Sequence, residues 1–283
     1  MGLGGYLMWT AVAREVYNAS GVRCLPIEQY ENGMMKIIMS PIFKNNKHII
    51  QEFNETENAF PLVLNSPHTN YCKQDTKERA IHRYDKHVIG QICEVYGITP
   101  NSLKCEMFFT NDEYHKVESL LASKKLNNEK FIIIEPHTKD GYTLNKTYPF
   151  KKWQSIADDI SQNINVIQVG QKTEHVLNNC IDMTGKTSFR EAALLISKSV
   201  LYVGSEGGLM HAANAVSTKS VIIITGFLHP DMTCYPDNVN IWVGKGHGPC
   251  GMKVICEKCR SECEEHDYNE VSSSVIECLG IKR

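Results

Sequence analysis

The second half of the chain alternates short apolar runs with amphipathic segments, and this alternation restricts the fold more than any other feature. The apolar runs predict buried strands at 131–134, 165–169, 200–203 and 220–225. Between them, the amphipathic pattern predicts helices that begin at Pro149, Ser188 and Leu209. Strands that alternate with helices favour a parallel sheet covered on both faces. The pattern therefore predicts an α/β fold.

The first half is less regular. Its pattern predicts helices at 6–17 and 76–96 and strands at 22–26, 34–39 and 106–109. The polar segment 124–130 has the composition of a linker. We therefore expect two α/β domains facing a cleft: residues 1–125, and residues 126–283 with a cysteine-rich C-terminal segment.

The glycines at the start of the chain are unusual for such a fold. The segment Gly2-Leu3-Gly4-Gly5 resembles a glycine-rich turn, and such a turn normally follows a strand. We therefore expect either that a first strand is missing or that the N-terminal domain is trimmed.

Composition excludes several classes of protein. The 283 residues include 30 Lys and Arg against 32 Asp and Glu, for a net charge of -2, so no basic surface for nucleic acid is expected. No stretch approaches the roughly 20 apolar residues of a transmembrane helix. The first residues lack a basic leader and a cleavage site. The expectation is a cytoplasmic protein.

Residues 203–211 combine an acid, two glycines and a histidine at a predicted strand-to-helix junction. Free N–H groups and the helix dipole bind anions at such a junction, and Gly207 and Gly208 would let a phosphate approach the backbone. Glu206 could accept hydrogen bonds from sugar hydroxyls. The alternative is a tight turn with a helix cap, and His211 taken alone is more often a packing residue. The combination favours a binding site.

Two further polar residues follow the predicted strand 131–134. Thr138 lies at its carboxyl edge, and Lys146 lies in the loop before the next helix. The Lys146 ammonium could neutralise the charge on a departing diphosphate. Taken locally, a solvated surface lysine is the better interpretation.

Five of the eleven cysteines lie close together near the C-terminus, and four of them have the spacing C-x5-C-x2-C-x3-C: Cys250, Cys256, Cys259 and Cys263, with Cys234 left over. Four thiolates suit a tetrahedral structural site for zinc or iron, with no open position for substrate. The alternative is a set of free thiols.

Several segments, taken in order, resemble glycosyltransferase family 9. Residues 182–191 (D-M-T-G-K-T-S-F-R-E) are similar to D-L-T-G-K-T-S-L-R-E, and 203–211 are similar to V-G-x-D-[ST]-G-x-x-H. Residues 146–149 followed by Trp153 are similar to K-x-W-P and its tryptophan, and 2–7 to G-x-G-D-x-L. The resemblance covers residues 130–230 best. Residues 225–230 with the later cysteines also resemble the autotransporter heptosyltransferases, a branch that carries iron on cysteines.

The resemblance implies a GT-B fold, in which two Rossmann-like domains face a cleft. It implies inverting transfer of a sugar, heptose or a related one, from a nucleotide diphosphate such as ADP-heptose to a hydroxyl of a glycan or protein, as in lipopolysaccharide biosynthesis. Lys146 and the N–H groups of Gly207 and Gly208 would then hold the diphosphate, with Thr138, Glu206 and His211 around the donor. Transfer itself would need no cofactor. The location would be the cytoplasm or the cytoplasmic face of the inner membrane, and a homo-oligomer stays open.

One departure from the family pattern concerns the chemistry directly. The family's opening loop carries an aspartate that acts as general base on the acceptor, whereas this chain has Gly5, next to Gly4, on the acceptor side. Base catalysis contributes roughly 100- to 10,000-fold in rate. Another carboxylate could substitute, and the sequence offers Glu28, Glu31 and Asp140. The alternatives are a catalytically silent sugar-nucleotide-binding subunit and a sugar-nucleotide epimerase.

Overall fold

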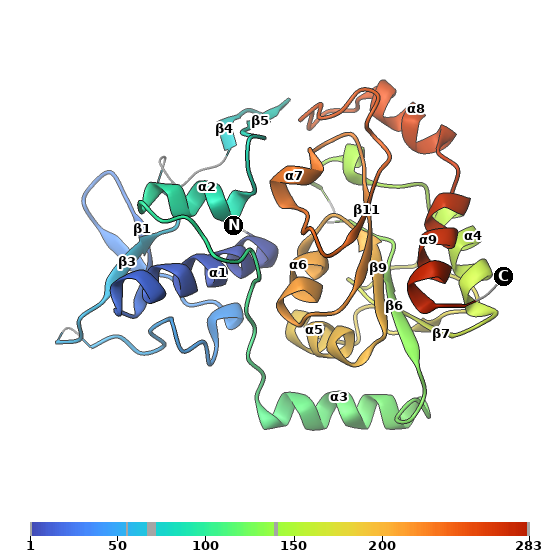
Figure 1. The fold of residues 1–283 in the computed structure, drawn as a ribbon, viewed down its shortest axis with the longest axis horizontal. Coiled ribbons are helices and arrows are strands. Elements are labelled where there is room, and N and C mark those ends of the chain that lie inside the picture. The colour runs from blue at the N-terminus through green and yellow to red at the C-terminus, as the bar shows by residue number, and fades with distance from the viewer. Residues whose placement is uncertain (1, 55, 67–71, 139–140, 282–283) are drawn as a thin grey trace.

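The computed structural model describes residues 2–54, 56–66, 72–138 and 141–281. The N-terminal and C-terminal halves form two lobes that lie side by side in Figure 1, each with its own sheet. A long connection runs from the first lobe past the second before the C-terminal sheet begins.

The C-terminal sheet confirms the predicted α/β fold. Its six strands lie in the order β11-β10-β9-β6-β7-β8, and every neighbouring pair is parallel. The strands are β6 (Phe131–Glu135), β7 (Asn165–Gln168), β8 (Ile181–Asp182), β9 (Leu201–Ser205), β10 (Ser220–Ile224) and β11 (Val239–Trp242). The chain order reverses between β6 and β9. Ligands bind beyond the carboxyl ends of the strands at such a switch point.

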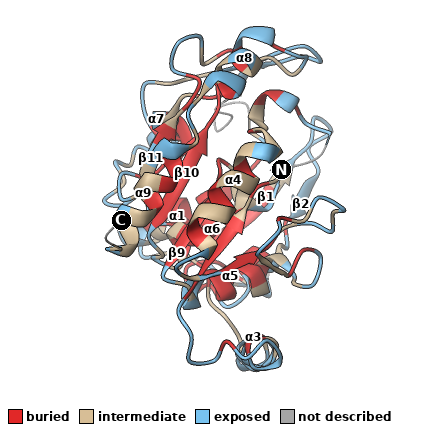
Figure 2. Cartoon of the chain, turned by 90° about the vertical axis from the view of Figure 1, so that its right-hand side faces the viewer, coloured by how far each residue is buried: buried red, intermediate tan, exposed pale blue. Residues whose placement is uncertain are grey.

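Helices cover both faces of this sheet. On one face lie α4 (Phe150–Ser161) and α9 (Asn269–Leu279), and on the other α5 (Phe189–Lys198) and α6 (Gly208–Ala215). Ile132 and Ile134 of β6 pack in the first layer, whereas Phe131 and Ile133 pack in the second. The strands are therefore continuous apolar runs, and Figure 2 shows them as the buried centre of the lobe. The short helices of this half are the 3-10 helix η2 (Leu144–Lys146), α7 (Pro230–Thr233) and α8 (Glu257–Glu265).

The N-terminal half has a smaller, mixed sheet in the order β2-β1-β3, with β1 antiparallel to β2 and parallel to β3. The hairpin β4–β5 follows this sheet in the chain. Helices α1 and α2 pack against each other beside the sheet. The elements are α1 (Leu3–Ser20), β1 (Cys24–Gln29), β2 (Met35–Ile37), the 3-10 helix η1 (Pro41–Phe43), β3 (Phe60–Val63), β4 (Cys72–Asp75), β5 (Ala80–His82) and α2 (Val88–Val95).

Two secondary-structure predictions for this half are wrong, and both fail because of long-range contacts. The predicted helix 76–96 begins only at Val88, because residues before it form β5, whose Ala80 N–H donates to the carbonyl of Gly251. The predicted strand 106–109 has no regular secondary structure and pairs with no strand of the described chain. Side chains replace the sheet ladder there: Asn214 accepts from Cys105 N, and Thr10 accepts from Glu106 N.

The glycine-rich turn predicted at the start of the chain is also wrong, since α1 begins at Leu3 and places Gly4 and Gly5 in its first turn rather than in a loop. A Cβ atom on Gly4 would lie 2.9 Å from the His211 ring and 3.0 Å from the Gly208 Cα atom. Glycine weakens a helix, but here it allows the first turns of α1 and α6 to touch.

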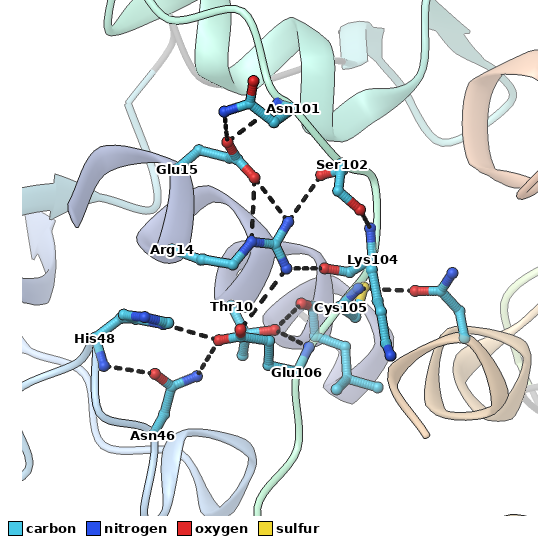
Figure 3. A network of polar contacts seen from close by, with 12 residues as sticks. Thr10, Arg14, Glu15, Asn46, His48, Asn101, Ser102, Lys104, Cys105 and Glu106 are labelled. Atoms are coloured by element: carbon cyan, nitrogen blue, oxygen red, sulfur yellow. Dashed lines mark hydrogen bonds and ion pairs between the residues drawn. The ribbon is translucent and has the colours of Figure 1, made fainter. Parts of the chain in front are cut away.

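The connection between the lobes is fastened to α1 by a polar network, shown in Figure 3. Arg14 donates to the carbonyl oxygens of Ser102 (2.8 Å) and Lys104 (2.5 Å). The Glu15 carboxylate accepts from Arg14 and from the backbone and side-chain nitrogens of Asn101. The connection is therefore held as part of the N-terminal lobe, although it has no regular secondary structure.

Helix α3 (Asn111–Ser123) follows this connection and packs against α5. The buried Arg190 of α5 binds Glu113 of α3 through Nε–Oε1 (2.5 Å) and Nη2–Oε2 (2.9 Å). It also donates to the carbonyls of Phe108 and Pro41, so one guanidinium joins both halves. The division at residue 125 stays a prediction, and these contacts favour a boundary before Asn111.

We expect R190M to lower the free energy of unfolding by about 3 kcal/mol at pH 7, since it leaves Glu113 without its cation. Arg190 holds the pKa of Glu113 at about 2, so this stabilisation is present above the ordinary glutamate pKa and is lost as pH falls toward 2. In urea unfolding, the difference in unfolding free energy between the variant and the wild type should therefore shrink below pH 4, without vanishing, because R190M also loses the hydrogen bonds to Phe108 and Pro41. The more exposed pair of Lys186 and Asp182 supplies the control, since K186M should lower the free energy of unfolding by less than about 1 kcal/mol. A loss in K186M as large as that in R190M would contradict this explanation.

Candidate functional site

A cavity of about 310 Å³ lies at the switch point of the C-terminal sheet, against the first turns of α1 and α6. The structure brings together at this cavity every non-cysteine residue predicted for the site: Gly4, Gly5, Thr138, Lys146, Glu206, Gly207, Gly208 and His211. These residues come from four separate segments of the chain, so the topology has assembled them. Their individual roles stay predictions.

Two helix N-termini point their backbone N–H groups toward this region. Helix α6 begins at Gly208 after the N-cap Gly207, and α1 begins at Leu3 after the N-cap Gly2. Both N-caps are glycines, so neither N-cap residue has a side chain that could accept from its helix. The first N–H groups of a helix have no partner within the helix, and the dipole adds partial positive charge. The arrangement suits a bound anion.

Lys146 and Glu206 form an ion pair inside the cavity, between Nζ and Oε2. Burial alone would raise the pKa of Glu206, but the nearby Lys146 ammonium outweighs it and lowers that pKa. The Lys146 amine also lies 5.8 Å from the centre of the Phe227 ring. The two charged groups predicted to bind different parts of a ligand therefore bind each other in the structure.

Asn145 holds the Lys146 loop in place, and no pattern in the sequence indicates this role. Its amide nitrogen donates to the carbonyls of Met252 (2.6 Å) and Val254 (2.7 Å), and its oxygen accepts from Cys256 N (2.9 Å). Asn145 is almost fully buried, at 1% exposure. The position of Lys146 thus depends on the segment that carries the cysteines.

A second cavity, of about 580 Å³, adjoins the first and shares Gly4, Thr138, Gly208 and Glu135 with it. It extends along the end of β7 at Gly170 and toward the start of α5. Sequence analysis missed Glu135, which ends β6 and accepts a hydrogen bond from the buried Tyr202 hydroxyl (2.7 Å). Burial raises the pKa of Glu135 to about 7.

His211 is both a packing residue and a lining residue. Its Nδ1 atom lies 2.6 Å from the Tyr235 hydroxyl, which in turn contacts the Cys105 thiol at 3.1 Å. Burial lowers the pKa of His211 to about 4, so the ring is neutral at pH 7. A neutral, fixed imidazole can orient a ligand by hydrogen bonding but adds no charge.

The cysteine cluster differs from the predicted set. Among the described residues, His247, Cys256 and Cys259 place one ligand atom each within 4.8 Å of one another. The Cys250 thiol lies beside those of Cys256 and Cys259. Cys263, predicted as the fourth ligand, lies outside this group and packs in the apolar layer under α9. On helix α8 it follows Cys259 by one turn, which places it about 6 Å further along the helix axis.

The ion pair in the cavity predicts a pH-dependent stability effect. K146M leaves the buried Glu206 carboxylate without a cation and should lower the free energy of unfolding by about 3 kcal/mol at pH 7. Lys146 keeps the wild-type pKa of Glu206 low, so its contribution is present at neutral pH and lost in acid. In the variant, burial raises that pKa, so the deficit should shrink between pH 7 and pH 5.

The double variant K146M/E206Q is the matched control in the same urea-unfolding measurement, since it removes both charges and should recover part of the loss. A deficit that does not change with pH, or a double variant less stable than K146M, would show that the pair does not account for the effect.

Residues 101–254 match glycosyltransferase family 9 (heptosyltransferase). This is more than half of the chain, and it includes Thr138, Lys146 and the segment 203–211. The protein belongs to glycosyltransferase family 9. No curated protein shows significant sequence similarity to it. None of the helices in the described ranges has the length and apolar character of a membrane span.

Solved structures of the family share the fold. A family 9 glycosyltransferase from Veillonella parvula is 14% identical, with a TM-score of 0.70 over 99% of this chain and 94% of its own. The iron-containing dodecameric heptosyltransferase TibC of Escherichia coli was solved with ADP-D-beta-D-heptose. It is 14% identical, with a TM-score of 0.66, and the match covers 99% of this chain and 74% of TibC. ADP-heptose lipopolysaccharide heptosyltransferase II of E. coli is 17% identical, with a TM-score of 0.52, and the match covers 69% of this chain and 62% of the E. coli chain.

Proposed function

We propose that the protein transfers a sugar from a nucleotide diphosphate donor to an acceptor hydroxyl with inversion. The observation that carries this proposal is the cavity at the switch point, where Lys146 and the uncapped N-terminus of α6 lie together. The family match supports the reaction class. The TibC complex, whose structure was solved with ADP-D-beta-D-heptose, supports an ADP-heptose-like donor. The acceptor would be a glycan or a protein.

The chemistry follows from where positive charge lies. The acceptor oxygen forms a bond to the anomeric carbon as the bond from that carbon to the diphosphate oxygen breaks, and the electron pair leaves with the diphosphate. The Lys146 ammonium and the N–H groups of Gly207 and Gly208 would stabilise that charge. Glu206 would accept hydrogen bonds from donor hydroxyls once the diphosphate competes for Lys146. The larger cavity, beside Gly170, would hold the nucleoside.

A screen of ADP-, GDP-, UDP- and CMP-linked sugars by thermal shift tests this proposal. Ligand at 100 times its dissociation constant stabilises by about 2.7 kcal/mol, so the preferred donor should raise Tm by on the order of 5 °C. K146M, compared with its own ligand-free Tm, should lose most of that shift, whereas the surface variant H115Q should keep it. A wild-type protein that no member of the panel stabilises would contradict the proposal.

Gly5 favours one other function, a catalytically silent subunit that binds the sugar nucleotide without turning it over. The donor selected by the screen separates the two. A transferase cleaves the donor slowly when water is the acceptor and faster when an acceptor of the sugar is present, and in both cases it releases the nucleotide. A silent subunit binds the donor tightly and releases no nucleotide.

We also propose that the cysteine cluster holds a structural metal ion, zinc or iron. The residues fit this role, because three buried thiols and one imidazole are the donors that tetrahedral zinc and iron sites use: Cys250, Cys256, Cys259 and His247. TibC, which shares the fold, is iron-containing. A metal ion here would fix the segment that bonds to Asn145 and thereby support Lys146.

The cluster supplies its own matched control for this proposal. Purified wild-type protein should contain close to one equivalent of zinc or iron by elemental analysis. C259S and H247A should each lose most of the metal and melt at lower temperature, whereas C263A should keep the metal. Wild-type protein without either metal, or C263A that loses it as completely as C259S, would contradict the proposed ligand set.

A further inference from the structure

The two halves of the chain contribute different kinds of residue to the cavity beside Lys146. Of the described residues that line it, those from the N-terminal half are Gly2, Gly4, Gly5, Met8 and His82. His82 is the one titratable side chain in that set. The acceptor side of the cavity, which carries glycine where the family carries an aspartate, therefore offers an imidazole instead.

A set of contacts with the cysteine segment brings His82 to the cavity. His82 ends β5, and Ala80 of the same strand donates its N–H to the carbonyl of Gly251 (2.8 Å). Next to it, the N–H of Lys253 donates to Glu78 O (2.7 Å), and the Arg79 side chain donates to Cys250 O (3.1 Å). The hairpin β4–β5 is thus held across the boundary between the lobes.

His82 lies among the charged groups of the cavity. Its ring meets the Phe227 ring edge-on at 6.4 Å, and Phe227 also lies under the Lys146 ammonium. Burial and then the Lys146 charge lower the pKa of His82 to about 4, and Lys253 acts in the same direction, against Asp75 and Glu206. The imidazole is therefore neutral at pH 7 and able to accept a proton.

The other acids and histidines among the described lining residues come from the C-terminal half, outside the acceptor side, and have contacts of their own there. Glu206 pairs with Lys146 on the leaving-group side, Glu135 accepts from Tyr202, and His211 is bonded to the Tyr235 hydroxyl. The carboxylates that the sequence offered as general base do not fill this role in the structure. Glu28 and Glu31 are not among the residues that line the cavity, and Asp140 lies outside the described residues.

We infer that His82 is the general base of the transfer reaction, in place of the family's aspartate; the inference rests on the proposed function. The imidazole takes the proton of the acceptor hydroxyl as that oxygen bonds to the anomeric carbon, and the diphosphate departs with the electron pair of the broken C–O bond. The imidazolium then releases its proton to solvent. Bound diphosphate offsets the charge of Lys146, which makes the imidazole a stronger base when the donor is present.

Kinetics and binding of His82 variants test the inference with the donor that the nucleotide-sugar screen selects. We expect H82Q to reduce the rate of nucleotide release, with water as acceptor, by roughly 100- to 10,000-fold. Its dissociation constant for ADP, measured by calorimetry, should stay within about twofold of the wild-type value, because general-base catalysis acts on the chemical step. H115Q, on the exposed face of α3, is the matched control and should change neither quantity.

Chemical rescue separates a proton acceptor from a structural residue. Added imidazole should restore turnover of H82A by tenfold or more and leave the wild type and H115Q unchanged. Wild-type kcat in H82Q, failure of imidazole to rescue H82A, or a wild type that binds donor without releasing nucleotide would each overturn the assignment. If the wild type binds no nucleotide or nucleotide sugar, the proposed function itself fails, and the role of His82 fails with it.

Discussion

The contact between the first turns of α1 and α6 is the constraint on which the site depends. Gly4 and Gly208 meet there without side chains, at a distance that a Cβ atom on Gly4 would not permit. The contact directs two uncapped helix N-termini at one cavity and leaves Lys146 as the nearby cation. Partial positive charge from backbone N–H groups costs no reorganisation when a dianion binds, which is what a departing diphosphate requires.

The cysteine-containing segment connects the two sides of this cavity. Its carbonyls bind Asn145, which fixes the Lys146 loop on the leaving-group side. Its Gly251 carbonyl pairs with Ala80, which fixes the hairpin of His82 on the acceptor side. One short segment therefore sets the separation between the proposed leaving-group cation and the proposed base. A structural metal ion on Cys256 and Cys259 would make that separation rigid without taking part in the reaction.

The sequence predicted the C-terminal half well because its strands are buried on both faces and appear as unbroken apolar runs, as in β6 and β10. It predicted residues that line the cavity because they lie just after the carboxyl ends of those strands, and their donor-binding roles stay predictions. The predictions for the first half failed where contacts between distant residues matter: β5 pairs with β4 and bonds to Gly251, and Gly4 lies in a helix whose first turn packs against Gly208. His82, Asn145 and Glu135 carry no local pattern, so only the fold could place them.

The most direct test of the account is a crystal structure of the protein with ADP. The account predicts a β-phosphate within hydrogen-bonding distance of the Gly207 and Gly208 amides and of the Lys146 ammonium, with Lys146 drawn from Glu206. A nucleotide bound elsewhere, with Lys146 and Glu206 still paired as in the ligand-free protein, would contradict it.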